Sequence, residues 1–167
     1  MRVKRESHRD LDRIDLNILR RLQADARITM TDLAEAVGLS VTPCAERVRR
    51  LERERFILGY AARLNPGRLG LALLVYVELK LAAKSGAMFD RFRREVSRIP
   101  SVLDCHLISG DFDYLIKARI PEIGAYRRLL GDRLLALPGV TESRSYVVME
   151  EIKETLELPL EADAGAD

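Results

Sequence analysis

The chain has 167 residues, 47% of them hydrophobic and 32% charged, with a net charge of +2, which is enough apolar content for one ordinary domain or two small ones. Its longest apolar run, residues 69–77, is too short to span a bilayer, and no apolar signal segment follows the basic N-terminus. Two distant cysteines and two histidines, His8 and His106, indicate neither a disulfide framework nor a zinc site and offer little acid–base chemistry. We therefore expect a soluble cytoplasmic protein with no membrane partner, no metal or other cofactor, and no enzymatic activity.

Positive charge is concentrated in the N-terminal part of the chain. Residues 1–66 carry a net charge of +4 and the remainder −2, and residues 140–167 hold 8 acidic against 2 basic groups. Five arginines fall among the nine residues 47–55. A local excess of this kind is a candidate surface for an anionic partner.

Two short helices are predicted before these arginines. Residues 12–24 repeat apolar side chains at helical intervals, with Asp10 or Asp12 as the N-cap. The stretch TMTDLAEAVGL follows, with Thr29 or Thr31 as the N-cap and an end at Gly38, where a left-handed backbone has no steric penalty. A glycine turn thus separates the second helix from the arginine-rich segment.

A third helix is predicted to begin at Ser40, in the stretch SVTPCAERVRRLERER. Ser40 can act as its N-cap, and a proline is tolerated in the first turn because the N–H groups there have no intrahelical partner. At 100° per residue, the apolar residues cluster on one side, and the opposite side carries Glu46, Arg49, Arg50 and Arg53. A helix, a glycine turn and a second helix with a cationic outer face form a helix-turn-helix, whose second helix enters the major groove of double-stranded DNA.

In this interpretation the arginines neutralise phosphates or bond to guanine, and three small residues near the helix start approach thymine methyl groups, namely Val41, Thr42 and Ala45. The alternative is a solvated helix face whose arginines pair with neighbouring glutamates. The preceding helix and Gly38 favour DNA binding.

The rest of the chain predicts a βαββαβ order. Residues 73–81 alternate as a strand, residues 88–99 have helical spacing, and further elements are expected at about 103–107 (strand), 114–120 (strand), 123–137 (helix) and 141–152 (strand). An internal echo, IPSV at 99–102 and LPGV at 137–140, supports two similar halves. The fold class is therefore α+β, with an N-terminal helix-turn-helix domain and a C-terminal ferredoxin-like domain whose sheet has one open face suited to a dimer.

The stretch SGDFDYL joins the two middle strands and has two interpretations. It is a polar hairpin whose aspartates bond to their own turn, or it receives the charged groups of a small ligand through a carboxylate and free backbone N–H groups.

Taken together, the runs DLDRIDLNIL, TPCAERVRRLERERFILGY, CHLISGDFDYLIKARIP and AYRRLLGDRLLALPGVTESRSYVVMEEIK resemble the Lrp/AsnC (feast/famine) family of transcription regulators. The resemblance implies a sequence-specific DNA-binding regulator, associated with the nucleoid, that forms homodimers and assemblies such as octamers and responds to an amino acid effector, leucine or another apolar amino acid. It implies DNA contacts from the helix at 40–53. It also favours the ligand-binding interpretation of the loop, within an effector cleft formed by Leu107, Gly110, Asp111, Phe112, Asp113, Ile123, Tyr146, Val147 and Val148.

The chain departs from the family pattern at Arg55, where relatives usually have glycine, and in its acidic tail, whose composition suggests a mobile end. We expect domains at 1–66 (DNA binding, with a linker strand), 67–153 (effector binding and oligomerisation) and 154–167 (acidic tail). Two rival functions are a regulatory amino-acid-binding subunit of a metabolic enzyme and an architectural DNA-binding protein without a ligand.

Overall fold

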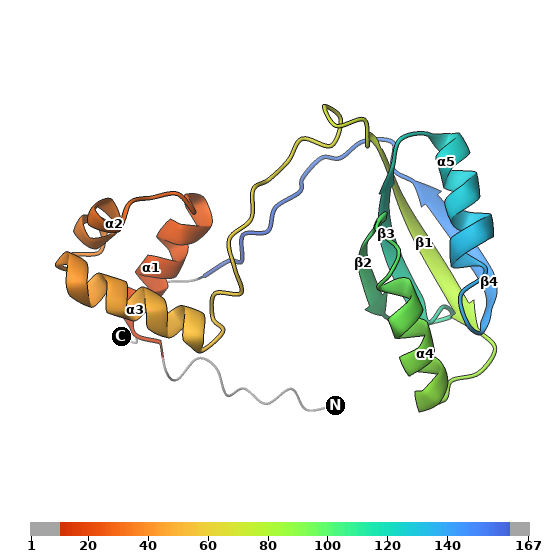
Figure 1. Ribbon diagram of the computed structural model, residues 1–167, viewed down its shortest axis with the longest axis horizontal. Helices are drawn as coiled ribbons and strands as arrows, with labels where there is room; N and C mark the ends of the chain where they lie inside the picture. The colour runs from red at the N-terminus through yellow and green to blue at the C-terminus, as the bar shows by residue number, and fades with distance from the viewer. Residues whose placement is uncertain (1–10, 161–167) are drawn as a thin grey trace, which may run out of the picture. The chain divides into compact units, whose positions relative to one another are not determined.

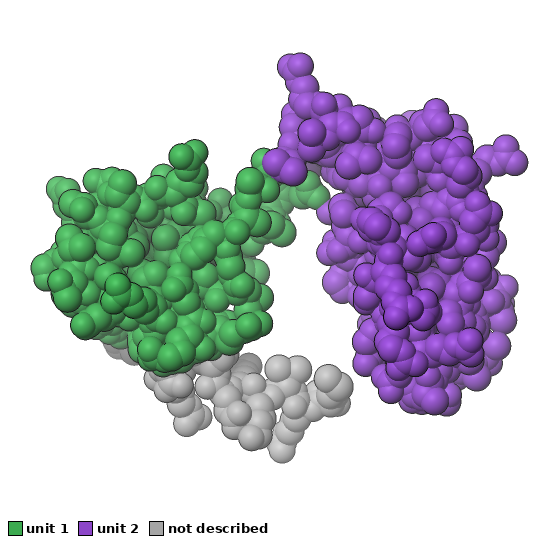
Figure 2. All heavy atoms as spheres, in the orientation of Figure 1, with its two compact units in different colours: residues 1–63, 154–167 green, residues 64–153 purple. Residues whose placement is uncertain are grey.

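The computed structural model describes residues 11–160, which form two compact units (Figures 1 and 2). The first unit contains the described residues up to Arg63 together with those from Glu154 onward, and the second spans Leu64–Lys153. Within residues 11–160, no helix is long and apolar enough to cross a membrane. The predictions for His8, Asp10 and residues 161–167 concern positions outside the described part.

The first unit is built from three helices, as predicted. Helix α1 (Arg13–Ala24) begins at the N-cap Asp12, whose carboxylate accepts a bond from the Asp15 backbone N–H, while Asp15 reciprocates to the Asp12 backbone. Helix α2 (Met30–Ala36) is capped by Thr29 and ends before Gly38, whose φ of +71° is left-handed. Both helix starts therefore come from side chains that satisfy free backbone N–H groups.

Helix α3 (Val41–Arg53) packs one side onto the other two helices. Its buried residues Cys44, Val48 and Leu51 are the ones that the helical spacing placed on the apolar side. Ser40 occupies the N-cap position, but its side chain makes no capping hydrogen bond. The cap therefore depends on backbone geometry rather than on the serine hydroxyl.

Helix α3 ends in a turn that contains Arg55, the position where relatives usually have glycine. The backbone N–H of Phe56 bonds to the Leu51 carbonyl at 2.9 Å, and that of Arg55 bonds to the Glu52 carbonyl at 3.1 Å, the pair of bonds that defines a Schellman turn. Arg55 takes the left-handed position of this turn, with a φ of +67°. The helix therefore does not continue through Arg55, and a side chain occupies a backbone conformation that favours glycine.

The second unit is a four-stranded antiparallel sheet in the order β2-β3-β1-β4, with all its helices on one face (Figure 1). The elements are β1 (Leu73–Leu81), α4 (Gly86–Val96), β2 (Val102–Leu107), β3 (Tyr114–Ile120), α5 (Ile123–Arg128), a π-helical continuation η1 (Leu129–Leu134), and β4 (Val140–Val147). This is the predicted ferredoxin-like order.

Alternation along β1 separates the two faces of the sheet. Val75, Val77 and Leu79 are fully buried beneath the helices, whereas Tyr76 and Glu78 between them face the opposite side and are half-buried. The helix-covered side closes around Phe92, which stacks on Tyr114 at 4.0 Å between ring centroids. One face of the sheet is thus a packed core, and the other remains available to a partner.

Three expected features differ in the structure. Strand β4 ends at Val147 rather than near residue 152, and its ladder with β1 ends at the Val75–Val147 pair. The linker at residues 58–65 is irregular rather than a strand. The segment Glu154–Leu160 belongs to the first unit, where it bonds to α1, so this part of the expected tail is not detached.

Candidate nucleic-acid interface and effector site

The outward face of α3 carries a straight stripe of exposed side chains. Thr42, Glu46, Arg49 and Arg53 follow one another at intervals of four, three and four residues, and all four are exposed. They lie opposite the buried Cys44, Val48 and Leu51. This α3 stripe has a net charge of +1 and a polar character, as expected of a surface that approaches DNA. Of the remaining residues predicted for this interface, Val41 is exposed, and Ser40 and Ala45 are partly or fully accessible at the helix start.

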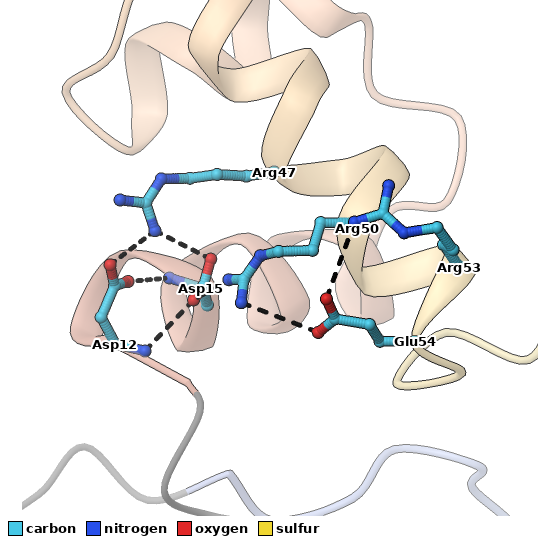
Figure 3. A network of polar contacts seen from close by, with 6 residues as sticks. All are labelled: Asp12, Asp15, Arg47, Arg50, Arg53 and Glu54. Atoms are coloured by element: carbon cyan, nitrogen blue, oxygen red, sulfur yellow. Dashed lines mark hydrogen bonds and ion pairs between the residues drawn. The ribbon is translucent and has the colours of Figure 1, made fainter.

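Arg50 does not share the stripe. It lies at the edge of the exposed face, and its guanidinium turns back to the buried carboxylate of Asp15 and lies 3.7 Å from Glu54 (Figure 3). The expectation that residues 46, 49, 50 and 53 face outward together is therefore correct for three of them. The physical reason is that a long arginine side chain reaches a buried carboxylate on another helix, where burial strengthens the ion pair.

A brace of four residues fixes α3 against α1, and the sequence reasoning missed it. Arg47 bonds to Asp12 at 2.5 Å and to Asp15 at 2.9 Å, and Arg50 bonds to the same Asp15 (Figure 3). Asp15 is only 1% exposed, whereas the side chains of Arg47 and Arg50 are about 30% exposed. We call Asp12, Asp15, Arg47 and Arg50 the α1–α3 brace. The sequence offered Asp10 or Asp12 as the N-cap, but the pairing of Asp12 and Asp15 with arginines 32 or more residues away had no local signal.

The brace shifts the pKa of Asp12, Arg47 and Arg50. Burial raises the pKa of Asp12, but the Asp15 backbone N–H and the Arg47 guanidinium outweigh this effect, and the pKa lies below the ordinary 3.8. Hydrogen bonds to Asp12 and Asp15 raise the pKa of Arg47, and a bond to Asp15 raises that of Arg50. The Arg47–Asp12 ion pair is therefore present at neutral pH, and together the contacts of the brace tie α3 to α1.

The loop that joins β2 and β3 is anchored by Asp113. Its buried carboxylate accepts a bond from the Leu81 backbone N–H at 2.8 Å and pairs with Lys84 at 2.8 Å, and its backbone N–H bonds to the Leu79 carbonyl at 2.9 Å. Burial raises the pKa of Asp113, but Lys84 and the Leu81 N–H outweigh it and lower the pKa below 3.8. The carboxylate is thus engaged within its own domain, and what it does is fix the loop.

The exposed part of the same loop has a different surrounding. The Arg144 guanidinium lies 5.0 Å from the centre of the Phe112 ring, within the range of a cation–π contact. Asp111 is exposed nearby and acts electrostatically on Arg144, which also lies 3.9 Å from Glu78. Sequence reasoning missed Arg144 and Glu78, although their alternation in β4 and β1 placed them on the open face.

The other predicted effector residues lie at the opposite end of the sheet. Val147 pairs with Val75 at the start of β1, and the Val148 N–H bonds to the Leu74 carbonyl at 3.0 Å, whereas Leu79 pairs with Tyr114 next to the loop. The four residue steps from Val75 to Leu79 span roughly 13 Å. Leu107 lies at the loop end and is 58% exposed, and Ile123 follows the far end of β3 and is also 58% exposed. Within one chain the predicted residues form a loop group (Leu107, Gly110, Asp111, Phe112, Asp113) and a strand group (Ile123, Tyr146, Val147, Val148). Tyr146 reaches from the strand group toward the loop, since its hydroxyl donates to Glu78 at 3.0 Å and Glu78 lies 3.9 Å from Arg144.

Comparison with known protein families assigns both units. Residues 74–158 match the Lrp/AsnC ligand binding domain, and residues 11–57 match a winged helix-turn-helix DNA-binding domain. The leucine-responsive regulatory proteins of Salmonella typhimurium and Escherichia coli are each 54% identical over 152 residues, which is 91% of this chain and 93% of theirs.

Solved structures of transcriptional regulators are also similar to this chain. A Neisseria meningitidis transcriptional regulator in complex with L-Met has a TM-score of 0.85 and 35% identity, and an AsnC family transcriptional regulator from Agrobacterium tumefaciens has a TM-score of 0.85 and 38% identity. Each comparison covers 90% of this chain and 97% of the other.

Proposed function

Since the chain belongs to the Lrp/AsnC family and is a DNA-binding transcriptional regulator with an amino-acid-binding domain, we propose that the α3 stripe reads its DNA sites and that a shared effector site senses an apolar amino acid. Family members of this kind are regulators and not enzymes. The observation that carries the proposal is the exposed stripe Thr42, Glu46, Arg49, Arg53 opposite a packed apolar side.

The DNA-binding step follows from the geometry of α3. From Thr42 to Arg53 the stripe is roughly 16 Å long, and a helix of this size fits the major groove. Arg49 and Arg53 supply phosphate or guanine contacts, Thr42 and Val41 are small enough to reach thymine methyl groups, and Glu46 can accept from cytosine N4. The α1–α3 brace holds this helix in place, so that Arg50 contributes through orientation rather than direct contact.

The effector site is proposed to combine two copies of the chain. The loop at 110–113 lies at one end of the sheet and Val147 and Val148 lie at the other, roughly 13 Å away along β1, so a ligand the size of an amino acid does not reach from one to the other. A site that uses both groups therefore takes the loop of one effector domain and the strand end of another. The loop offers Asp111 for the ammonium group and N–H groups for the carboxylate, while Ile123 and Val148 suit an apolar side chain.

This arrangement requires an oligomer. We propose a homodimer that uses the open face of the sheet, with higher assemblies such as an octamer. A two-fold dimer reads half-sites separated by whole helical turns of about 34 Å. The proposed domains are 1–66 and 67–153, and the divisions between compact units after Arg63 and after Lys153 lie within three residues of these limits, although Glu154–Leu160 groups with the first unit rather than forming a separate tail. The protein acts in the cytoplasm, in association with the nucleoid.

Leucine is the first effector to test, since the relatives are named for it, and methionine is the second, since one structural neighbour holds L-Met.

The proposal is tested by selecting duplexes from a random pool with the full-length protein and comparing its affinity for selected and unselected DNA, with and without leucine or methionine. We expect selected sites to bind at least roughly 10³-fold more tightly, and the amino acid to change that affinity. An architectural protein shows no enrichment and no ligand effect. A regulatory enzyme subunit binds the amino acid but neither kind of DNA.

A further inference from the structure

The C-terminal segment of the described chain is bonded to α1. The side-chain amide of Gln23 accepts from the Leu158 backbone N–H at 2.7 Å and donates to the Leu158 carbonyl at 3.2 Å. A single side chain thus satisfies both backbone groups of one residue, as a neighbouring strand does. Pro159 follows, and its fixed φ keeps this part of the segment extended.

Arg20, one helical turn before Gln23, holds the next backbone position. Its Nε donates to the Leu160 carbonyl at 2.8 Å, and another nitrogen donates to Asn17 at 2.7 Å. The remaining nitrogen, Nη2, is buried and has no acceptor among the residues that the structure describes.

A third contact lies at the other end of the segment. Arg63 donates to the Glu154 carbonyl at 2.9 Å. Residues 154, 158 and 160 are therefore all bound through their backbone carbonyls by side chains of the first unit, and residue 158 also through its N–H. In Figure 1 the segment, in blue, runs from the last strand to α1, and Figure 2 colours it with the first unit.

We propose that Glu154–Leu160 is an intramolecular strap whose binding surface is the Arg20–Gln23 face of α1, and that this strap couples the effector domain to DNA binding. Six residues separate the strap from the end of β4, which carries Tyr146 and Val147 of the strand group. A change at the end of β4 is therefore passed along a short, directly bonded stretch of chain to the helix that the brace ties to α3. The coupling part of this inference rests on the proposed function, whereas the docking of the strap does not.

Docking is tested on the full-length protein by amide hydrogen exchange, with Gln23→Ala as the variant and Arg21→Ala as the matched control. Arg21 is the exposed cation between the two strap-binding residues, so its removal changes charge without touching the strap. We expect exchange of the Leu158 amide to accelerate several-fold in Gln23→Ala and to remain at the wild-type rate in Arg21→Ala. Equal exchange rates of the Leu158 amide in wild type and Gln23→Ala contradict docking of the strap on this surface, and this result does not depend on whether the protein binds DNA.

Coupling is tested with the same two variants by measuring the ratio of DNA affinities with and without a saturating amino acid from the effector screen. We expect the ratio to move toward one in Gln23→Ala, while the DNA affinity without ligand and the amino acid affinity stay within about twofold of wild type. A full wild-type ratio in Gln23→Ala, with accelerated Leu158 exchange, overturns the coupling and leaves the strap as a docked segment only. If wild type itself shows no ligand effect, the proposed function fails, and the exchange experiment still decides the docking.

Discussion

Arg55 occupies a position at the end of α3 where the backbone is left-handed, with a φ of +67°. A residue with a Cβ is less stable than glycine in this conformation, because the Cβ approaches the carbonyl oxygen that follows. The two Schellman hydrogen bonds nevertheless form, so the rest of the turn outweighs the local strain. The departure from the family pattern thus affects stability rather than the course of the chain.

The first prediction concerns this strain. We expect Arg55→Gly to raise the free energy of unfolding of the DNA-binding unit by about 0.5–1 kcal/mol, since the relief of strain exceeds the extra entropy of glycine in the unfolded chain. Arg53→Gly, two residues earlier at a helical φ, is the control and is expected to lower it by about 0.5–1 kcal/mol. Urea denaturation measures both, and an equal loss of stability in the two variants contradicts the strain.

Asp113 was expected in the effector cleft, but its contacts indicate a structural role. Its carboxylate satisfies a buried backbone N–H of Leu81 and pairs with Lys84. We expect Asp113→Ala to lower the free energy of unfolding of the effector domain by about 1–3 kcal/mol, because a buried donor is left without an acceptor. Asp111→Ala, in the same loop but exposed, is the control that leaves stability unchanged. Thermal unfolding monitored in the effector domain distinguishes the two.

The pH dependence of Asp113 follows from its lowered pKa. A carboxyl group whose pKa is lower in the folded than in the unfolded state stabilises the protein above its unfolded value, here near 3.8, and this contribution is lost as the pH falls through the folded pKa. We therefore expect the stability difference between wild type and Asp113→Ala to be constant at neutral pH and to shrink below about pH 3.8. A difference that persists unchanged at pH 2 contradicts an ionised Asp113 in the folded domain.

At the scale of elements, the α1–α3 brace connects stability to the orientation of the recognition helix. We expect Asp15→Ala to lower the free energy of unfolding of the DNA-binding unit by roughly 2–4 kcal/mol, since both Arg47 and Arg50 lose their buried partner. Glu35→Ala, an exposed acidic residue of α2, serves as the control. If Asp15→Ala and wild type have denaturation curves of equal midpoint, the brace does not stabilise the DNA-binding unit.

Elements were predictable where local chemistry decides them. The helix caps, the left-handed Gly38 and the alternation along β1 all depend on neighbours within a few residues. The structure confirms Gly38 and the alternation, and it shows Asp12 and Thr29 as the caps among the two candidates that the sequence left open for each. The end of β4 depends instead on its pairing with β1, about seventy residues away in the chain. Arg50 was misplaced for the same reason: helical spacing gives the direction of its Cβ, whereas a carboxylate on another helix decides where the guanidinium lies.

At the scale of the whole molecule, the separation of the two effector groups predicts complementation between copies. Asp111→Ala disables the loop group and Val148→Asp the strand group, so we expect each variant alone to lose amino acid binding. Dissociating and reassembling an equal mixture is expected to restore about a quarter of the sites, because half of the loops meet half of the strand ends at random. Titration calorimetry counts the restored sites, and a mixture that binds no better than its components places the site within one chain.

The claim on which the account depends most is that the α3 stripe, and not the brace, contacts DNA. The direct measurement is the dependence of DNA affinity on salt concentration for wild type, Arg49→Ala and Arg50→Ala. The account predicts that Arg49→Ala weakens binding and reduces the slope of log affinity against log salt by about 1, the loss of one phosphate contact, while Arg50→Ala keeps the wild-type slope and is less stable. An unchanged affinity and slope in Arg49→Ala, or a reduced slope in Arg50→Ala alone, contradicts it.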